Sequence, residues 1–211
     1  MTIIDISMPM ELDMPVYKNR EAKRPKIKVT QDFKSGSVFE SRMDIDLHTG
    51  THMDAPLHMI EDGEDITVYP INQFISPCRV LDLSHVKDHI TREHLIEKQV
   101  LPGEFVLLKT RNSFDDEFNP EFVFLEKSGA EYLAGKDIEG VGIDSLGIER
   151  SQPGHETHKA LLSKRIKILE GLRLETVEEG PYVLVATPHN IPGAEASPVR
   201  ALLADRKYFN L

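Results

Sequence analysis

Three histidines and one aspartate lie within eleven residues of this chain, in the segment His48-Thr-Gly-Thr-His52-Met-Asp54-Ala-Pro-Leu-His58. Imidazole nitrogens and carboxylate oxygens are the ligands that zinc, manganese and iron(II) accept in proteins. Burying so many polar groups without a cation is costly, because each ring would need its own hydrogen-bond partner. The alternative is a loop in which every polar residue has such a partner. The density of ligands favours the first half of a metal site.

The local sequence allows these side chains to meet. In an extended backbone His48, His52 and Asp54 share parity and point to one side. Gly50 permits a bend, and Pro56 ends any strand pairing. A tight turn could therefore bring both imidazoles and the carboxylate to one ion. Three protein ligands would leave a position open to water or substrate, as a catalytic metal requires.

Further ligands could come from the second half of the chain. His155 and His158 are one helical turn apart, and by spacing alone each is as readily a ligand as a residue on a solvated helix face. They do not form the H-E-x-x-H signature, because their spacing is three rather than four. Glu170 follows the apolar residues Ile168 and Leu169, and a carboxylate at the end of a buried strand needs a cation nearby. This pattern alone leaves the role of Glu170 open.

Composition narrows the class of protein. The chain has 211 residues, of which 40% are hydrophobic and 28% charged, which is typical of a soluble globular protein. We expect a single domain over residues 1–211. The net charge of −10 argues against nucleic-acid binding. No signal peptide and no apolar run of roughly 20 residues is present, which predicts a cytoplasmic location without a membrane partner. The one cysteine, Cys78, is expected to be a small buried hydrophobe.

Short β-rich runs alternate with a few helical patterns, which predicts a strand-rich α/β fold. We expect strands at 3–7, 26–30, 79–83, 105–110, 141–145, 167–169 and 182–187. Polar and apolar residues also alternate from Phe39 to Leu47, so a strand there would carry His48 on its polar face. Helices are expected at 92–99, from a capping box at Ser128 to Ala134, at 155–164, and from Pro198 to Ala204.

The histidine segment resembles the motif H-x-G-T-H-x-D-x-P-x-H of the metal-dependent hydrolases of the cyclase family, which include bacterial kynurenine formamidase and isatin hydrolase. His158 and the run Ile168-Leu-Glu170-Gly-Leu resemble its second motif, a histidine twelve residues before a glutamate. The runs Val141-Gly-Ile-Asp144-Ser and Ala196-Ser-Pro-Val-Arg-Ala are similar to the closing half of the family. The resemblance extends over nearly the whole chain.

The resemblance implies a ligand set and an architecture. His48, His52 and Asp54 would bind one metal ion, Asp54 and Glu170 would be shared between two ions, and His158 would bind the second. It implies two zinc ions per subunit, with manganese as the alternative, and a set of nitrogen and oxygen ligands suits either. The fold would be a compact swivelling-type β/α/β domain that assembles as a homodimer or tetramer.

His58 stands four residues beyond Asp54 and past Pro56, so it could lie near an ion without binding it. The resemblance implies that His58 is a catalytic proton donor and acceptor; the alternative is a residue that only orients a ligand. A metal lowers the pKa of bound water from about 15.7 to about 7. The resulting metal-bound hydroxide would attack a carbonyl carbon, and His58 would protonate the leaving nitrogen.

The predicted activity is therefore hydrolysis of a small-molecule amide, either an arylformamide or a cyclic amide. Two alternatives remain: a cyclase, dehydratase or lactone hydrolase using the same site, and a non-enzymatic metal-binding protein. The second alternative requires a closed coordination sphere with no open position.

The segment before the histidine cluster departs from the resemblance. Kynurenine formamidases carry a Trp-Pro-Gly-type segment there, whereas this chain reads Met14-Pro-Val-Tyr17-Lys-Asn-Arg20 and contains no tryptophan. We expect Tyr17 to replace part of the missing aromatic contact with substrate. A basic segment follows from Lys18 to Lys28. It could recruit an anionic substrate, but the pattern favours a solvated loop.

Overall fold

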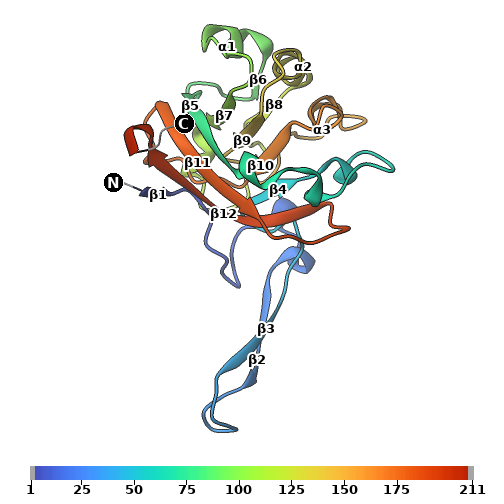
Figure 1. Cartoon of the computed structure of the whole chain (residues 1–211), viewed down its shortest axis with the longest axis vertical. Coiled ribbons are helices and arrows are strands. Elements are labelled where there is room, and N and C mark those ends of the chain that lie inside the picture. The colour runs from blue at the N-terminus through green and yellow to red at the C-terminus, as the bar shows by residue number, and fades with distance from the viewer. Residues whose placement is uncertain (1–2, 209–211) are drawn as a thin grey trace.

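The computed structural model describes residues 3–208, and its central feature is an eight-stranded mixed sheet that closes on itself (Figure 1). The strand order is β1-β12-β11-β5-β7-β9-β10-β4, and β12 also pairs with β4, which completes a barrel. These strands are β1 (Ile3–Asp5), β4 (His52–Asp54), β5 (Ile75–Asp82), β7 (Phe105–Lys109), β9 (Gly140–Ile143), β10 (Lys167–Glu170), β11 (Gly180–Pro188) and β12 (Ala196–Asp205). The predicted strand-rich α/β class is confirmed.

Three α-helices lie together on one side of the sheet (Figure 1). They are α1 (Arg92–Glu97), α2 (Lys127–Gly135) and α3 (Glu156–Leu162), accompanied by the small parallel pair β6 (His89–Ile90) and β8 (Phe124–Leu125). Short 3-10 helices occupy the connections: η1 (Tyr17–Asn19), η2 (Glu21–Lys23), η3 (Pro56–His58), η4 (Ile66–Val68), η5 (Ile71–Phe74), η6 (Arg111–Phe114) and η7 (Arg206–Tyr208). No described helix has both the length and the apolar composition needed to cross a lipid bilayer.

The parallel strands β7, β9 and β10 are buried on both faces because each face packs against a different core, and β5 pairs parallel with β7 at their edge. In β7, Val106 and Leu108 pack with apolar residues of the helices. The alternate residues Phe105 and Leu107 pack on the other side of the sheet with residues such as Leu203 of β12. Cys78 is buried in this second core, as expected, and burial raises the pKa of its thiol to about 12.

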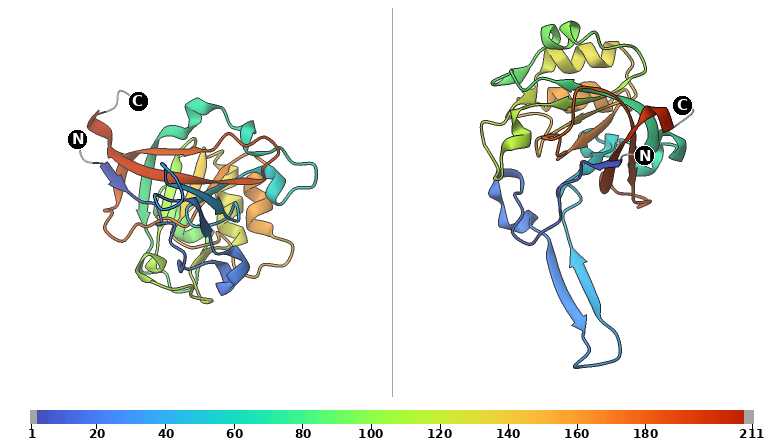
Figure 2. Two further views of the ribbon diagram at one scale, coloured as in Figure 1. Left: turned by 90° about the horizontal axis from the view of Figure 1, so that it is seen from below. Right: turned by 90° about the vertical axis from the view of Figure 1, so that its left-hand side faces the viewer.

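A two-stranded arm projects far from the barrel (Figures 1 and 2). It consists of β2 (Lys26–Gln31) and β3 (Glu40–Asp44), which pair antiparallel. The strand expected from Phe39 to Leu47 therefore exists only over its middle part. It ends at Asp44 and does not carry His48, which lies in the turn that follows. Its apolar face is exposed rather than packed on a core, and Phe39 and Met43 are 58% and 49% exposed.

The predicted helix from Pro198 to Ala204 is wrong, because these residues belong to β12. Alternating residues of this strand enter the core, and pairing with β1, β11 and β4 outweighs a local preference for helix. The predicted capping box at Ser128 is also replaced: α2 begins one residue earlier, at Lys127, and the carboxylate of Glu126 accepts the N–H of Ser128 at 3.1 Å.

Gly171 tests how closely the histidine segment approaches β10. Its φ is +69°, and a Cβ at this position would lie 2.3 Å from the carbonyl oxygen of Gly50. We predict that Gly171→Ala lowers the free energy of unfolding by more than the left-handed penalty of about 1–2 kcal/mol, because backbone would have to move. Gly103→Ala is the matched control, with φ +74° and open space around it. Equal losses in urea unfolding would contradict the close approach.

Candidate metal centre

The histidine segment is a buried turn followed by a short strand. Gly50 has a φ of +64°, which allows the chain to reverse before β4. Thr51 fixes the turn, because its hydroxyl donates to the carbonyl of Gly171 at 2.6 Å and accepts the N–H of Met8 at 2.7 Å. His52 and Asp54 then lie two residues apart on β4 and face the same side. The tight turn expected from Gly50 is thus present.

Strand β4 brings the two halves of the cluster together. It lies between β10 and β12, and its register on β10 pairs His52 with Glu170. The carboxylate expected at the end of β10 therefore stands beside the first half of the site. His158 is a buried residue of α3, the helix that packs against β10. The sequence pattern did not predict β4, because three residues are too few to show a period.

The five predicted ligands form one cluster around the carboxylate of Asp54. Its Oδ1 lies 3.1 Å from Nδ1 of His48 and 3.5 Å from Nε2 of His52, and its Oδ2 lies 3.6 Å from Nε2 of His158. The Glu170 carboxylate lies 3.3 Å from Nε2 of both His52 and His158. All five sequence-predicted ligands thus meet in space, although they come from four different elements.

Several atoms of this cluster are buried without a hydrogen-bond partner. Among the described residues these include Nε2 of His52, Nδ1 of His158 and both carboxylate oxygens of Asp54. A buried carboxylate with no donor is unfavourable, and a divalent cation would satisfy it. The donor set is nitrogen and oxygen without sulfur, which zinc and manganese both accept. The residues present therefore fit a metal ion.

In the absence of an ion, the negative charges of the carboxylates and the positive charges of protonated imidazoles stabilise one another. Burial opposes ionisation of Asp54, but contacts with His158 and His48 hold the pKa of this carboxyl well below its usual value. Burial likewise opposes protonation of His52, but the carboxylates of Glu170 and Asp54 raise its pKa to about 9. A bound cation would replace these protons, so metal binding and proton release are linked at this site.

His58 lies at the edge of the cluster, with one potential ligand atom within 4.8 Å of such atoms of His48 and Asp54. Its ring centre is 4.1 Å from that of His48 and 5.5 Å from that of His158. Burial lowers the pKa of His58 to about 4. It is carried by η3, which begins at Pro56, so the chain turns away from β4 before His58. A neutral imidazole that lines the cavity together with His48 and His158 is suited to proton transfer.

Glu149 is a residue of the site that sequence reasoning missed. Its carboxylate accepts the backbone N–H groups of Thr157 and His158, and its Oε2 lies 3.3 Å from Nδ1 of His158. Its Oε1 contacts Nδ1 of His155 at 2.5 Å. Glu149 precedes α3 by seven residues, beyond the range of a capping pattern, so no local signal marks it. His155 contacts Glu149 rather than Asp54, so of the two histidines only His158 belongs to the Asp54 cluster.

The cluster opens into a cavity of about 280 Å³. Tyr17, Met59 and Leu146 form much of its apolar wall. The Tyr17 ring packs edge-on against Phe118 and Phe122, with ring centres 5.4 and 6.3 Å apart. Tyr17 thus lines the cavity beside the cluster. The basic segment divides in two: its first cations, Lys18, Arg20 and Lys23, line the cavity, whereas Lys26 and Lys28 belong to the arm.

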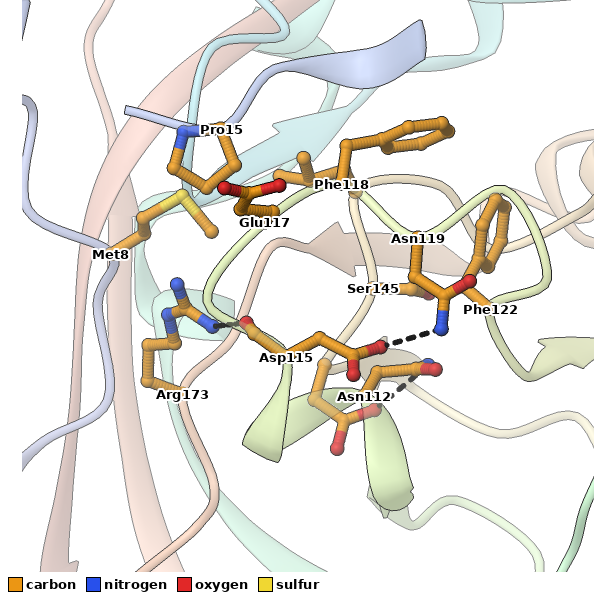
Figure 3. Close-up of a pocket in the computed structure, with 12 residues that line it drawn as sticks. Met8, Pro15, Asn112, Asp115, Glu117, Phe118, Asn119, Phe122, Ser145 and Arg173 are labelled. Carbon is orange, nitrogen blue, oxygen red and sulfur yellow. Dashed lines mark hydrogen bonds between the residues drawn. The ribbon is translucent and has the colours of Figure 1, made fainter. Parts of the chain in front are cut away.

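Figure 3 shows a smaller cavity, which Phe118 and Phe122 help to line. Asp115 is its centre, because its carbonyl accepts Nη1 of Arg173 at 3.2 Å and its carboxylate accepts Nδ2 of Asn119 at 3.0 Å. This cavity has a volume of about 30 Å³, which suits a water molecule rather than a substrate. Phe118 and Phe122, which line this cavity, also pack against Tyr17.

Comparisons with known proteins identify the family. The Cyclase family model matches residues 4–150, and the chain belongs to this family. Kynurenine formamidase of Salinibacter ruber is 32% identical over 208 residues, which cover 97% of this chain and 98% of that protein. A protein described as a predicted metal-dependent hydrolase from Bacillus stearothermophilus is 49% identical, with a TM-score of 0.88 over 96% of this chain and 97% of that one.

Isatin hydrolase A from Labrenzia aggregata has the same fold, with a TM-score of 0.83 at 23% identity, over 96% of this chain and 93% of that one. The family model ends before His158 and Glu170, but the similarity to kynurenine formamidase continues through them. The prediction of a cyclase-family hydrolase acting on carbon–nitrogen bonds other than peptide bonds is confirmed at the level of enzyme class.

Proposed function

We propose that this chain hydrolyses the carbon–nitrogen bond of an arylformamide or a cyclic amide. The observation that carries the proposal is the cluster of buried imidazoles and carboxylates, which opens on one side into a cavity that His58 also lines. A structural metal site would be closed, without an open side or an adjacent base. The similarity to kynurenine formamidases supports the choice of an amide.

We infer that the five ligands hold two zinc ions, with manganese as the alternative. His48, His52 and Asp54 would hold the first ion, and Asp54, Glu170 and His158 the second. Bound ions supply Lewis acidity, which activates water and polarises a carbonyl oxygen. Glu149 contacts Nδ1 of His158, so it would keep the opposite nitrogen of that ring directed at Asp54 and Glu170.

The remaining steps belong to residues of the chain. The imidazole of His58 accepts a proton from the attacking water and delivers it to the leaving nitrogen, so that the amine departs neutral. The ring of Tyr17 forms the wall against which an aryl group would pack. Met59 and Leu146 continue this apolar surface.

Asp54→Ala tests the ligand assignment. We predict that this variant loses both ions, because Asp54 contacts three of the imidazoles and is the proposed shared ligand. Elemental analysis after dialysis against metal-containing buffer measures the loss. Asp137→Ala, which removes a carboxylate that is 81% exposed, is the control and should keep the wild-type metal content. Full metal content in Asp54→Ala would refute the assignment.

His58→Ala tests the proton-transfer role. We predict that this variant keeps its metal and loses roughly 10²–10⁴-fold in turnover of formanilide, the loss typical of a removed general acid–base group. His85→Ala, at an exposed histidine of the described surface, should retain turnover. Screening formanilides, isatin and lactones on metal-loaded wild-type protein tests the activity itself. Turnover of lactones alone would favour the alternative chemistry, and no change in His58→Ala would remove its role.

We also propose that the chain forms a homo-oligomer through the arm. Ile27, Val29 and Met43 share one face of the β2–β3 pair and are each about half exposed. An isolated two-stranded hairpin is marginally stable in water, so this face needs a cover. Residues 23–44 carry six Lys or Arg and three Asp or Glu, in a chain whose net charge is −10. A second copy therefore offers an oppositely charged surface, and homo-oligomers are common.

The double variant Ile27→Lys with Val29→Lys tests this interface. We predict that the wild-type chain sediments as a dimer or tetramer at micromolar concentration and that the double variant sediments as a monomer, because charge replaces the apolar face. Lys28→Thr changes the opposite face of the same strand and is the control. A monomeric wild-type chain, or an unchanged double variant, would exclude the arm as the interface.

A further inference from the structure

Two of the cations that line the cavity beside the Asp54 cluster lack a carboxylate partner among the described residues. Of the three basic residues that line it, Lys23 forms an ion pair with Asp46 at 3.0 Å. Lys18 instead places its Nζ 5.3 Å from the centre of the Tyr17 ring. No described residue forms an ion pair or hydrogen bond with the guanidinium of Arg20. A guanidinium carries five N–H donors in a planar fork that matches a carboxylate.

The acidic groups that line this cavity are already engaged. Glu170 contacts His52 and His158 and accepts the N–H of Ile148 at 2.6 Å. Glu149 contacts His155 and His158. No other described lining residue is a carboxylate. An incoming ammonium group would therefore find only cations without partners in this cavity, whereas an incoming carboxylate would find opposite charges free to bind it.

The backbone that presents these cations is held in an unfavourable conformation. Lys18 and Asn19 have φ values of 57° and 50°, in the left-handed region that residues with a Cβ seldom adopt. The segment is fixed at one end by the packing of Tyr17 and at the other by Thr49, whose hydroxyl donates to the carbonyl of Lys23 at 3.2 Å. Backbone strain of this kind gathers at binding sites, where surrounding contacts maintain it.

We propose that Lys18 and Arg20 form a carboxylate-binding subsite and that the substrate is an aromatic amide with one negative charge remote from its scissile bond. This inference rests on the proposed function, because the metal centre fixes where the amide must lie. The aromatic ring would then pack against Tyr17, between the amide and the carboxylate. An aromatic amide that also carries an ammonium group beside its carboxylate is disfavoured, because that group would meet the same two cations.

Three formamides that share one formanilide core and differ in the charge at the para position test the subsite on zinc-loaded protein: 4-formamidobenzoate, formanilide and N-(4-aminomethylphenyl)formamide. We expect kcat/KM for the benzoate to exceed that for formanilide roughly tenfold, as one charge-assisted contact at an accessible site provides. The cationic compound should be the poorest of the three. The preference should appear mainly in KM and should shrink in high salt, because the subsite is exposed.

Arg20→Gln, alone and combined with Lys18→Gln, should reduce the preference for the benzoate to within about twofold of unity. Arg92→Gln is the matched control: it removes the same charge on α1, at the far side of the helical layer from the arm, and should keep the preference (Figure 1). Calorimetric binding of the benzoate and of formanilide to the same proteins gives a second readout that does not depend on turnover.

The outcomes separate this inference from the proposed function. Turnover of formanilide without any preference for the benzoate, or with a preference that survives in Arg20→Gln, overturns the subsite and leaves the hydrolase intact. Absence of turnover for all three compounds, with tighter binding of the benzoate that Arg20→Gln abolishes, supports the subsite and overturns the arylformamide activity. Equal binding of both compounds by every variant overturns the subsite whatever the turnover.

Discussion

Two buried carboxylates on neighbouring strands are the constraint on which the rest of this structure depends. Asp54 on β4 and Glu170 on β10 are almost fully buried, and their like charges repel more strongly there than in water. Three imidazoles offset that charge only in part, because both oxygens of Asp54 remain without a hydrogen bond. A cation would complete the balance, and the fold must in any case hold the two carboxylates together against their own repulsion.

Closure of the barrel meets this requirement. Strand β4 has only three residues, too few to be stable alone, but it pairs with β10 on one edge and with β12 on the other. Strand β12 also pairs with β11 along most of its length. Through β10 and β12, strand β4 is therefore joined to strands from both ends of the strand order. The contact between Gly171 and Gly50 adds a steric limit on the same segment. The position of Asp54 is therefore set by three strands rather than by one loop.

The sequence predicts features that depend on neighbouring residues, but not those that depend on contacts between residues far apart in the chain. Ligand types and the turn at Gly50 are local, and they were predicted from eleven residues. The pairing of His158 and Glu170 with them came only from a family resemblance, because it depends on a strand register between segments more than a hundred residues apart. Strand β12 was predicted as a helix and Glu149 was missed for the same reason: neither has a local pattern that reveals its distant partners.

The residues proposed for the chemical step and the basic residues proposed to select the substrate lie on different elements of this molecule. As a sequence, Lys18 to Lys28 is one run of charge, but Lys18 and Arg20 face the cavity while Lys26 and Lys28 lie on the arm. Three of the proposed metal ligands, His52, Asp54 and Glu170, lie on paired strands. Lys18 and Arg20 instead lie in and beside the 3-10 turn η1, in a segment attached mainly through Tyr17 and Lys23. Changes in this segment can alter which molecule enters without disturbing Asp54, because no barrel strand passes through it.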